Sequence, residues 1–212
     1  MNISSPLFNL KTRSMLIEEE LLLSYGAAVE DLKNSEIIFN EGDTPRLFYQ
    51  IRRGRIKLSH FNEDGKELIL AVLHNGFSVC ELLLFIDKKY PVTAAAIEPT
   101  SIITLSKEKF MKLLDENPNI SRDINSFLSQ RLYYKYIMLQ NNSSLHPEIR
   151  IKGALEYHKS FSNNMSKFAF EVPFTRKELA AITGLRTETV VRCIKKLEKE
   201  NYLKIIERKI YV

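Results

Sequence analysis

The stretch FTRKELAAITGLRTETVVRCIKKLEKENYLKIIERKIYV occupies residues 174–212 and decides the C-terminal fold. Its apolar residues recur at three- and four-residue spacing, which is typical of short amphipathic helices. They form one group before Gly184 and one after it: Leu179, Ala180 and Ile182, then Val190, Ile194 and Leu197. A glycine between two helices permits a tight turn because it has no Cβ. The segment therefore predicts two short helices joined at Gly184, with Leu185 packed between them.

Polar residues mark the start of the first helix and the outer face of the second. Thr175 can cap the first helix, and Glu178 is placed to complete a capping box. The apolar positions of the second helix leave a polar face outside, made of Arg186, Thr187, Glu188, Thr189, Arg192 and Lys195. Two helices around a tight turn, with such a face on the second, predict a helix-turn-helix whose side chains read base edges.

Positive charge is concentrated in the same segment. Residues 174–212 contain ten lysines and arginines against five glutamates, and the rest of the chain is electrically balanced. A cationic module on a neutral body is typical of proteins that bind the phosphate backbone of nucleic acids. The alternative is a solvated basic helix pair, but it does not account for the capping residues or the Gly184 turn.

Length and composition limit the class of protein. The 212 residues fit one large domain or two small ones, and 44% hydrophobic residues are typical of a folded globule. No apolar run approaches the roughly 20 residues of a membrane span, and a signal peptide is not expected at the N-terminus. We therefore expect a cytoplasmic protein with no membrane partner. Cys80 and Cys193 are too few for an iron–sulfur cluster, and a disulfide is not expected in a reducing compartment.

Short strands separated by turns are predicted between residues 35 and 105. Gly42, Gly54, Gly65 and Gly76 follow one another at nearly regular intervals, and residues 62–65 read as a hairpin turn. This pattern is typical of a small antiparallel barrel or jelly roll. The predicted strands are residues 36–40, 47–52, 55–61, 67–73, 93–96 and 101–105.

From Lys107 onward the apolar spacing becomes helical. Ser106 can cap a first helix that ends near Leu114, and Pro118 can open a much longer one. The long helix has an apolar seam formed by Ile120, Ile124, either Phe127 or Leu128, Leu132 and Leu139. We expect this seam to pair two copies of the chain, and the alternative is a helix packed on its own barrel. Residues 141–147 are the predicted hinge, followed by a helix over 148–159 and a short strand over 168–172.

Several motifs occur in a fixed order: Glu41-Gly42-Asp43, Arg53-Gly54, Asp64-Gly65-Lys66-Glu67, Cys80-Glu81-Leu82, Arg131-Leu132, Arg150-Ile151, Thr175-Arg176-Lys177-Glu178 and Glu188-Thr189-Val190-Val191-Arg192. With Gly184, they make residues 35–212 resemble the CRP/FNR family of bacterial transcription regulators. The resemblance implies an α+β fold with an N-terminal antiparallel β-roll of the double-stranded β-helix or jelly-roll type. It predicts a β-roll sensor domain over 1–115, a dimerisation helix and hinge over 116–145, and a winged helix-turn-helix over 146–212.

The resemblance also implies which residues contact double-stranded DNA. Glu188 and Arg192 match the family's base-contacting glutamate and arginine, which are suited to cytosine N4 and to guanine O6 and N7. Thr187 and Val191 differ from the residues of better-known members, so a different operator is expected. Phosphate contacts are implied at Thr175, Arg176, Arg186 and Thr189. The alternative for Glu188 and Arg192 is an ion pair along one helix face.

The effector site departs from the family's pattern. Members that bind cyclic nucleotides carry Gly-Glu-Leu and Arg-Ser-Ala, where this chain has Cys80-Glu81-Leu82 and Val92-Thr93-Ala94. A buried phosphate without its arginine lacks a partner charge, a loss that costs roughly 3–5 kcal/mol. Lys135 and Tyr136 replace the threonine and serine that read adenine in relatives. Control by cyclic AMP is therefore not expected, although Lys88, Lys89 or Lys135 remains a candidate replacement for the missing charge.

The sequence fits other signals and functions less well. Haem is not expected because no histidine follows Cys80 at the spacing seen in CO-sensing relatives. The open alternatives are a diverged cyclic-nucleotide site, a redox response through Cys80, an unknown small-molecule effector, or no ligand at all. Neither a cofactor nor a metal is predicted, and the four histidines lack the spacing of a metal-dependent enzyme, so an enzyme is not expected. RNA polymerase is a candidate partner.

Overall fold

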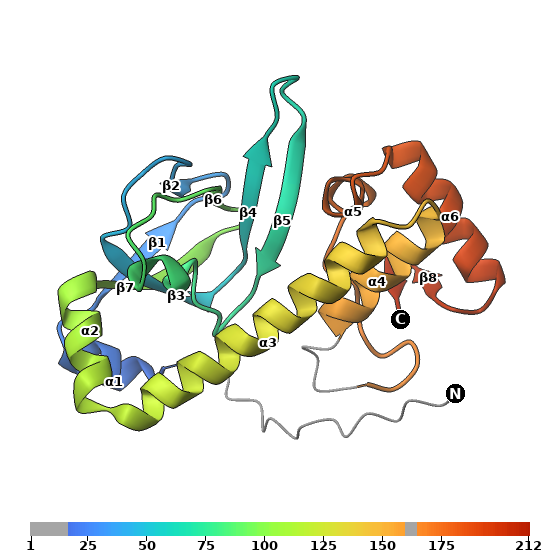
Figure 1. Ribbon diagram of the computed structural model, residues 1–212. Coiled ribbons are helices and arrows are strands. Elements are labelled where there is room, and N and C mark those ends of the chain that lie inside the picture. The colour runs from blue at the N-terminus through green and yellow to red at the C-terminus, as the bar shows by residue number, and fades with distance from the viewer. Residues whose placement is uncertain (1–16, 160–164) are drawn as a thin grey trace.

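The computed structural model describes residues 17–159 and 165–212. Figure 1 shows three parts: a β-roll, one long helix that runs away from it, and a helical C-terminal unit at the far end. The predicted α+β arrangement is confirmed.

Two antiparallel sheets form the β-roll. One has the strand order β1-β7-β3 and the other the order β2-β6-β4-β5. Side chains such as Ile51, Ile56 and Ile102 fill the space between them, because alternate residues of each strand point inward. The strands are β1 (Ala28–Leu32), β2 (Ile37–Phe39), β3 (Leu47–Arg53), β4 (Ile56–Phe61), β5 (Glu67–Leu73), β6 (Thr93–Ala96) and β7 (Thr100–Ser106).

The predicted strand bounds are close to the observed ones, but three elements of this region could not be recognised from the sequence pattern. Strands β5 and β6 have the predicted bounds, and the other four predicted strands differ by one residue at one end or at both. The sequence analysis missed α1 (Glu19–Ser24), β1 and the short 3₁₀ helix η1 (Glu81–Leu84). Four of the five β1 residues are exposed, so this strand lacks the alternation that reveals a strand.

Two helices lead out of the roll. Helix α2 (Lys107–Glu116) is capped by the Ser106 side chain, which accepts a hydrogen bond from the Lys109 backbone nitrogen. Helix α3 (Pro118–Asn142) opens on its proline as predicted and has 25 residues. Phe110 and Leu113 of α2 and Ile124 of α3 lie in one buried cluster, which fixes the start of α3 against the roll.

In the part of the chain that the structure describes, the C-terminal unit contains three helices and a small hairpin. These are α4 (Pro147–Lys159), α5 (Arg176–Thr183), α6 (Thr187–Lys199), β8 (Lys204–Ile206) and β9 (Lys209–Tyr211). The predicted strand over 168–172 is not formed as a strand, but its second half pairs with the end of the chain. Phe168 has a left-handed backbone with φ 63°, which turns the chain, and Glu171 forms an isolated bridge to Tyr211. The Val172 nitrogen donates to the Ile210 carbonyl at 2.8 Å, and Phe170 and Val212 exchange backbone hydrogen bonds at 3.2 and 3.0 Å. The apolar side chains of this segment pack on the helices.

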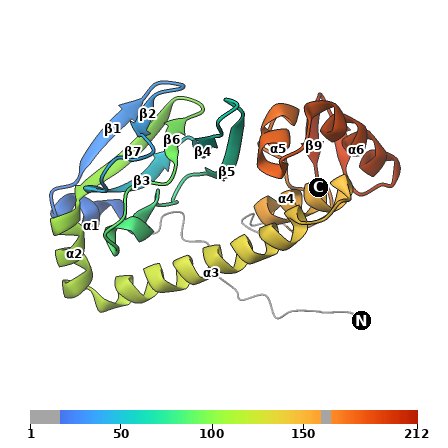
Figure 2. The ribbon, with the colours of Figure 1, turned by 45° about the horizontal axis from the view of Figure 1, so that its top comes forward.

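The roll and the C-terminal unit are in contact. Figures 1 and 2 both show α5 beside the β4–β5 hairpin. Ile69 and Val72 of β5 belong to the same buried cluster as the residues of α5 and α6. The Arg55 guanidinium pairs with Glu98 at 2.7 Å and donates a short hydrogen bond to the Pro173 carbonyl. The position of the C-terminal helices therefore depends on the roll.

Candidate DNA-binding surface and effector region

The turn between α5 and α6 has the geometry that the sequence predicted. The Thr175 hydroxyl accepts a hydrogen bond from the Glu178 backbone nitrogen at 3.2 Å, and the Thr175 nitrogen donates to the Glu178 carboxylate at 2.7 Å. Gly184 ends α5 in a left-handed conformation with φ 66°. This conformation lets the chain reverse into α6 without strain.

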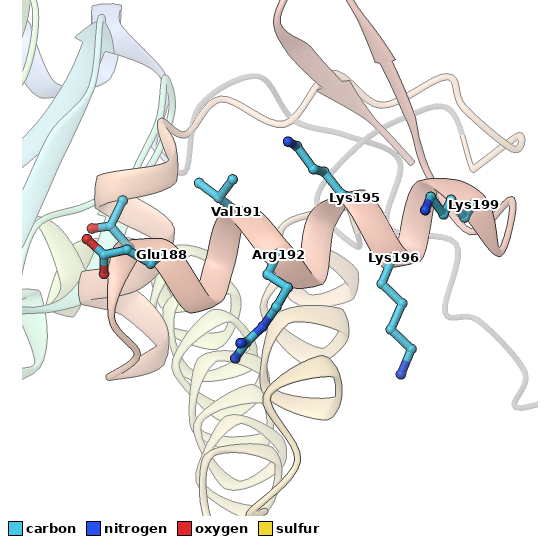
Figure 3. A pocket seen from close by; sticks show the side chains of 7 residues that line it. Glu188, Val191, Arg192, Lys195, Lys196 and Lys199 are labelled. Atoms are coloured by element: carbon cyan, nitrogen blue, oxygen red, sulfur yellow. The ribbon is translucent and has the colours of Figure 1, made fainter.

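Helix α6 presents a charged face to solvent. Val190, Cys193, Ile194 and Leu197 are buried beneath it, so the opposite side of the helix is fixed outward. That side lines an open pocket of about 770 Å³. The lining residues, most of them labelled in Figure 3, are Thr187, Glu188, Val191, Arg192, Lys195, Lys196 and Lys199. A helix whose exposed face is cationic and whose side chains end in hydrogen-bonding groups suits the major groove of DNA.

Glu188 and Arg192 do not form the ion pair that was the alternative interpretation. Both side chains are exposed, and within residues 17–159 and 165–212 no ion pair or hydrogen bond joins them to each other or to a neighbour. Figure 3 shows the Arg192 guanidinium directed away from the Glu188 carboxylate. Their hydrogen-bonding groups are therefore available to a partner that lies along α6.

The predicted phosphate-contacting residues surround the start of each helix. Thr175 and Arg186 are exposed, whereas Arg176 and Thr189 are half-buried. The Arg176 guanidinium donates to the Arg208 carbonyl in the β8–β9 turn, so it ties the wing to the start of α5. Arg176 therefore has a structural contact in addition to its predicted contact with phosphate.

The sequence analysis missed two lining residues, Lys196 and Lys199, although the helical spacing of the charged residues could have revealed them. Lys196 lies four residues after Arg192, and Lys199 four after Lys195, so both extend the outer face of α6. Val191 extends it on the other side. Lys196 also pairs with Glu148 of α4 at 2.8 Å, which anchors α6 to the preceding helix. This ion pair lowers the pKa of Glu148 and raises that of Lys196.

Glu81 of the predicted effector region is already bound by another residue of the chain. Its side chain is buried, with 1% of the residue exposed, and pairs with Arg131 of α3 at 2.8 Å. The sequence analysis quoted Arg131 as a family motif but did not assign it to this site. Neighbouring Leu82 is exposed and points away from the roll core.

Cys80 and Val92 lie inside the roll. Burial raises the pKa of the Cys80 thiol to about 12, so the thiol is protonated at neutral pH. Both residues belong to the main cluster of the roll, where the Tyr90 ring stacks on Phe39 with 3.6 Å between ring centres. The Thr93 hydroxyl accepts a hydrogen bond from the Glu41 backbone nitrogen at 3.1 Å.

Of the three cations that were candidates to replace the missing arginine, Lys135 lies near enough to Cys80 to interact with it electrostatically, whereas Lys88 and Lys89 lie elsewhere. The Lys135 ammonium donates to the Leu70 carbonyl at 2.7 Å, and its pKa is lowered by burial and by the nearby Arg131 charge. Tyr136 is exposed on α3. Lys88 and Lys89 line a separate pocket of about 270 Å³ that Val92 does not line. The assignment of these residues to an effector stays a prediction.

Neither a metal-ligand cluster nor a membrane-spanning helix occurs among the residues that the structure describes. In the described part of the chain, no group of three or more histidine, cysteine, aspartate or glutamate side chains is arranged to hold a metal ion. Among the same residues, no helix has both the length and the apolar character needed to cross a bilayer.

A β-roll joined by a long helix to a winged helix-turn-helix defines a class of DNA-binding transcription regulators. Residues 29–117 match the family profile of the cyclic nucleotide-binding domain, and residues 153–212 match that of the Crp-like helix-turn-helix domain. The chain therefore belongs to the CRP/FNR family of transcription regulators.

Relatives with known roles agree with this assignment. The chain is 27% identical over 168 residues to the cAMP-activated global transcriptional regulator CRP of Salmonella typhimurium, covering 78% of this chain and 80% of that protein. It is 27% identical to the transcriptional activator protein FnrA of Stutzerimonas stutzeri, covering 81% and 71%. The c-di-GMP-responsive regulator CLP of Xanthomonas campestris has the same fold, with a TM-score of 0.72 at 22% identity, covering 91% and 96%.

Proposed function

We propose that the protein is a homodimeric, sequence-specific transcription regulator that binds a palindromic operator through α6. The observation that carries the proposal is that the Glu188 and Arg192 side chains are both exposed and have no partner among the described residues. They lie on the outer face of a helix-turn-helix whose first helix begins with a complete capping box. Arg192 suits guanine O6 and N7, and Glu188 suits cytosine N4. Lys195, Lys196 and Lys199 supply positive charge along the same face for phosphates.

The apolar surface of α3 supports the homodimer. Leu132, Tyr136 and Leu139 are 54%, 59% and 70% exposed, and they follow one another at four- and three-residue spacing. This seam continues the spacing of the buried residue Ile124 along one helix. A second copy that packs on it removes the three side chains from water, as in a two-stranded coiled coil. Two copies also present two recognition helices, as a palindrome requires.

The described residues favour regulation without cyclic AMP. Val92 is buried where a cation would have to hold a phosphate, and Lys135 is held at Leu70. The alternative of a redox response through Cys80 is disfavoured, because a thiol with a pKa of about 12 contains almost no reactive thiolate at neutral pH. The proposal includes contact with RNA polymerase only because RNA polymerase is the general partner of transcription regulators.

Repeated selection from random duplex DNA tests the proposal. Full-length protein is expected to enrich an imperfect palindrome whose half-sites lie one helical turn apart. Light scattering of the same sample should give the mass of two chains. Enrichment of no common sequence, or a monomer that binds single half-sites, would reject the proposed function.

A further inference from the structure

Val191 is an apolar residue on the outer face of α6, which otherwise carries polar and charged side chains. It is 37% exposed and lines the open pocket of this face together with Glu188 and Arg192. Val190, the residue before it, is fully buried. Among the described residues, the buried cluster beneath α6 includes Val190 and Ile194 but not Val191. The packing of the C-terminal unit therefore does not account for a valine at this position.

The helical backbone does not account for the valine either. A β-branched side chain loses rotamer freedom in a helix, so valine is a weaker helix former than alanine, lysine or glutamate. An apolar side chain that stays in water also gains little from the hydrophobic effect. Val191 thus weakens α6 slightly in the free protein, and its contribution is expected only when a partner covers this face.

Val191 lies beside the two residues that are predicted to read bases. Residues three and four positions apart are neighbours on the surface of a helix, so Val191 adjoins Glu188 and Lys195. Figure 3 shows Val191 and Lys195 on one side of the exposed face and Arg192 on the other. A DNA duplex that meets Arg192 therefore brings a neighbouring base pair to Val191.

The chemistry of valine limits which base it can read. Its two methyl groups neither donate nor accept hydrogen bonds. In the major groove, guanine, adenine and cytosine present hydrogen-bonding groups, and thymine alone presents an apolar group, its C5-methyl, beside the O4 acceptor. A polar base edge covered by valine would lose water without gaining a partner. Contact with a thymine methyl avoids this cost and removes apolar surface of both groups from water.

We propose that Val191 determines operator specificity by packing against the C5-methyl group of a thymine in each half-site. The inference rests on the proposed function and names a base that the recognition helix requires in addition to those suited to Arg192 and Glu188. One methyl group removed from water changes the affinity about fourfold. A symmetric dimer makes the contact twice, so the whole palindrome should depend on it about fifteenfold.

Deoxyuridine tests the inference, because it differs from thymidine only by the missing methyl group. Each thymine of the selected palindrome is replaced by deoxyuridine at the symmetry-related positions of both half-sites, and full-length protein is titrated with each duplex. One of these replacements is expected to lower the affinity about fifteenfold. In Val191→Ala, whose shorter side chain does not reach the methyl group, the same replacement should cost less than about threefold.

Lys195→Ala is the matched control, because Lys195 is the neighbour of Val191 on the same side of α6. This variant should bind all DNA more weakly but keep the full deoxyuridine loss, since it retains the valine. Urea titration checks that Val191→Ala is folded. Its stability is expected to equal or exceed that of wild type, because alanine is the better helix former.

The outcomes separate the two proposals. Three results would overturn the inference and leave the proposed function standing: half-sites without thymine, deoxyuridine losses below about threefold at every position, or an equal loss in Val191→Ala and wild type. If the selected DNA contains no common palindrome, the proposed function itself fails and the inference fails with it.

Discussion

At the scale of single residues, Arg192 provides the sharpest prediction. Its guanidinium has no partner within the described residues and faces outward from α6. Arg192→Ala should therefore cost roughly 1–3 kcal/mol of binding free energy on the selected palindrome and little on random DNA. Binding isotherms on both DNAs measure the difference. Equal losses on the two DNAs would contradict a base-reading function.

Arg176 should behave differently because its predicted partner is a phosphate. Arg176→Ala is expected to weaken binding to all sequences alike and to reduce the slope of log affinity against log salt by about one. The substitution also frees the Arg208 carbonyl, so the wing loses a contact with α5. Salt titrations of the variant and of wild type measure the slope. An unchanged slope would limit Arg176 to its structural contact with the wing.

At the scale of elements, Gly184 determines how α5 meets α6. A Cβ added there would meet no atom within 4 Å, so only the left-handed backbone opposes a side chain. Gly184→Ala should lower the free energy of unfolding by about 1–2 kcal/mol through this strain. Urea titration measures the change. Gly65→Ala is the matched control, since Gly65 has φ 73°, equally open surroundings and a place in the β4–β5 turn.

The control also separates stability from function. Both variants should lose similar stability, but only Gly184→Ala should weaken operator binding, because it alone changes the angle of α6. Equal operator affinity for the two variants would show that the turn does not set the orientation of the recognition helix.

At the scale of the whole molecule, two histidines make stability depend on pH, one of them half-buried (His74) and the other buried (His158). The His74 and His158 rings lie 6.2 Å apart, centre to centre, where the roll meets α4. Burial lowers the pKa of His74 from 6.5 to about 4, and the nearby Arg55 charge adds to this shift. Burial lowers the pKa of His158 from 6.5 to about 3, and His74 adds to that shift. The unfolded chain therefore binds more protons than the folded chain below pH 6.5.

The free energy of unfolding is accordingly expected to be highest above pH 6.5 and to fall as the pH is lowered toward 4. Each histidine contributes a slope of up to about 1.4 kcal/mol per pH unit. Urea titrations between pH 7.5 and pH 5, within the range where most proteins stay folded, measure it. His158→Gln should reduce the slope, whereas His146→Gln leaves the imidazoles of His74 and His158 in place and should retain it. A slope that His158→Gln leaves unaltered would rule out His158 as its source.

The sequence by itself determined the local structure of this protein. Apolar spacing, Thr175, Glu178 and Gly184 act over neighbouring residues, so the helix-turn-helix, the capped α2 and the start of α3 follow from short-range chemistry. Most strands were predictable for the same reason. Strand β1 was not, because it lies exposed and is fixed only by its pairing with β7.

Only the tertiary structure decided how distant residues meet. Glu81 and Arg131 are fifty positions apart, and no periodicity relates them. The same is true where the roll meets the C-terminal unit. Strand β5 packs against α5, and Arg55 donates a hydrogen bond to the Pro173 carbonyl. The burial of His158 also depends on residues that are distant in the sequence. Such pairs form because the packed chain excludes water and leaves each buried charge one partner in reach.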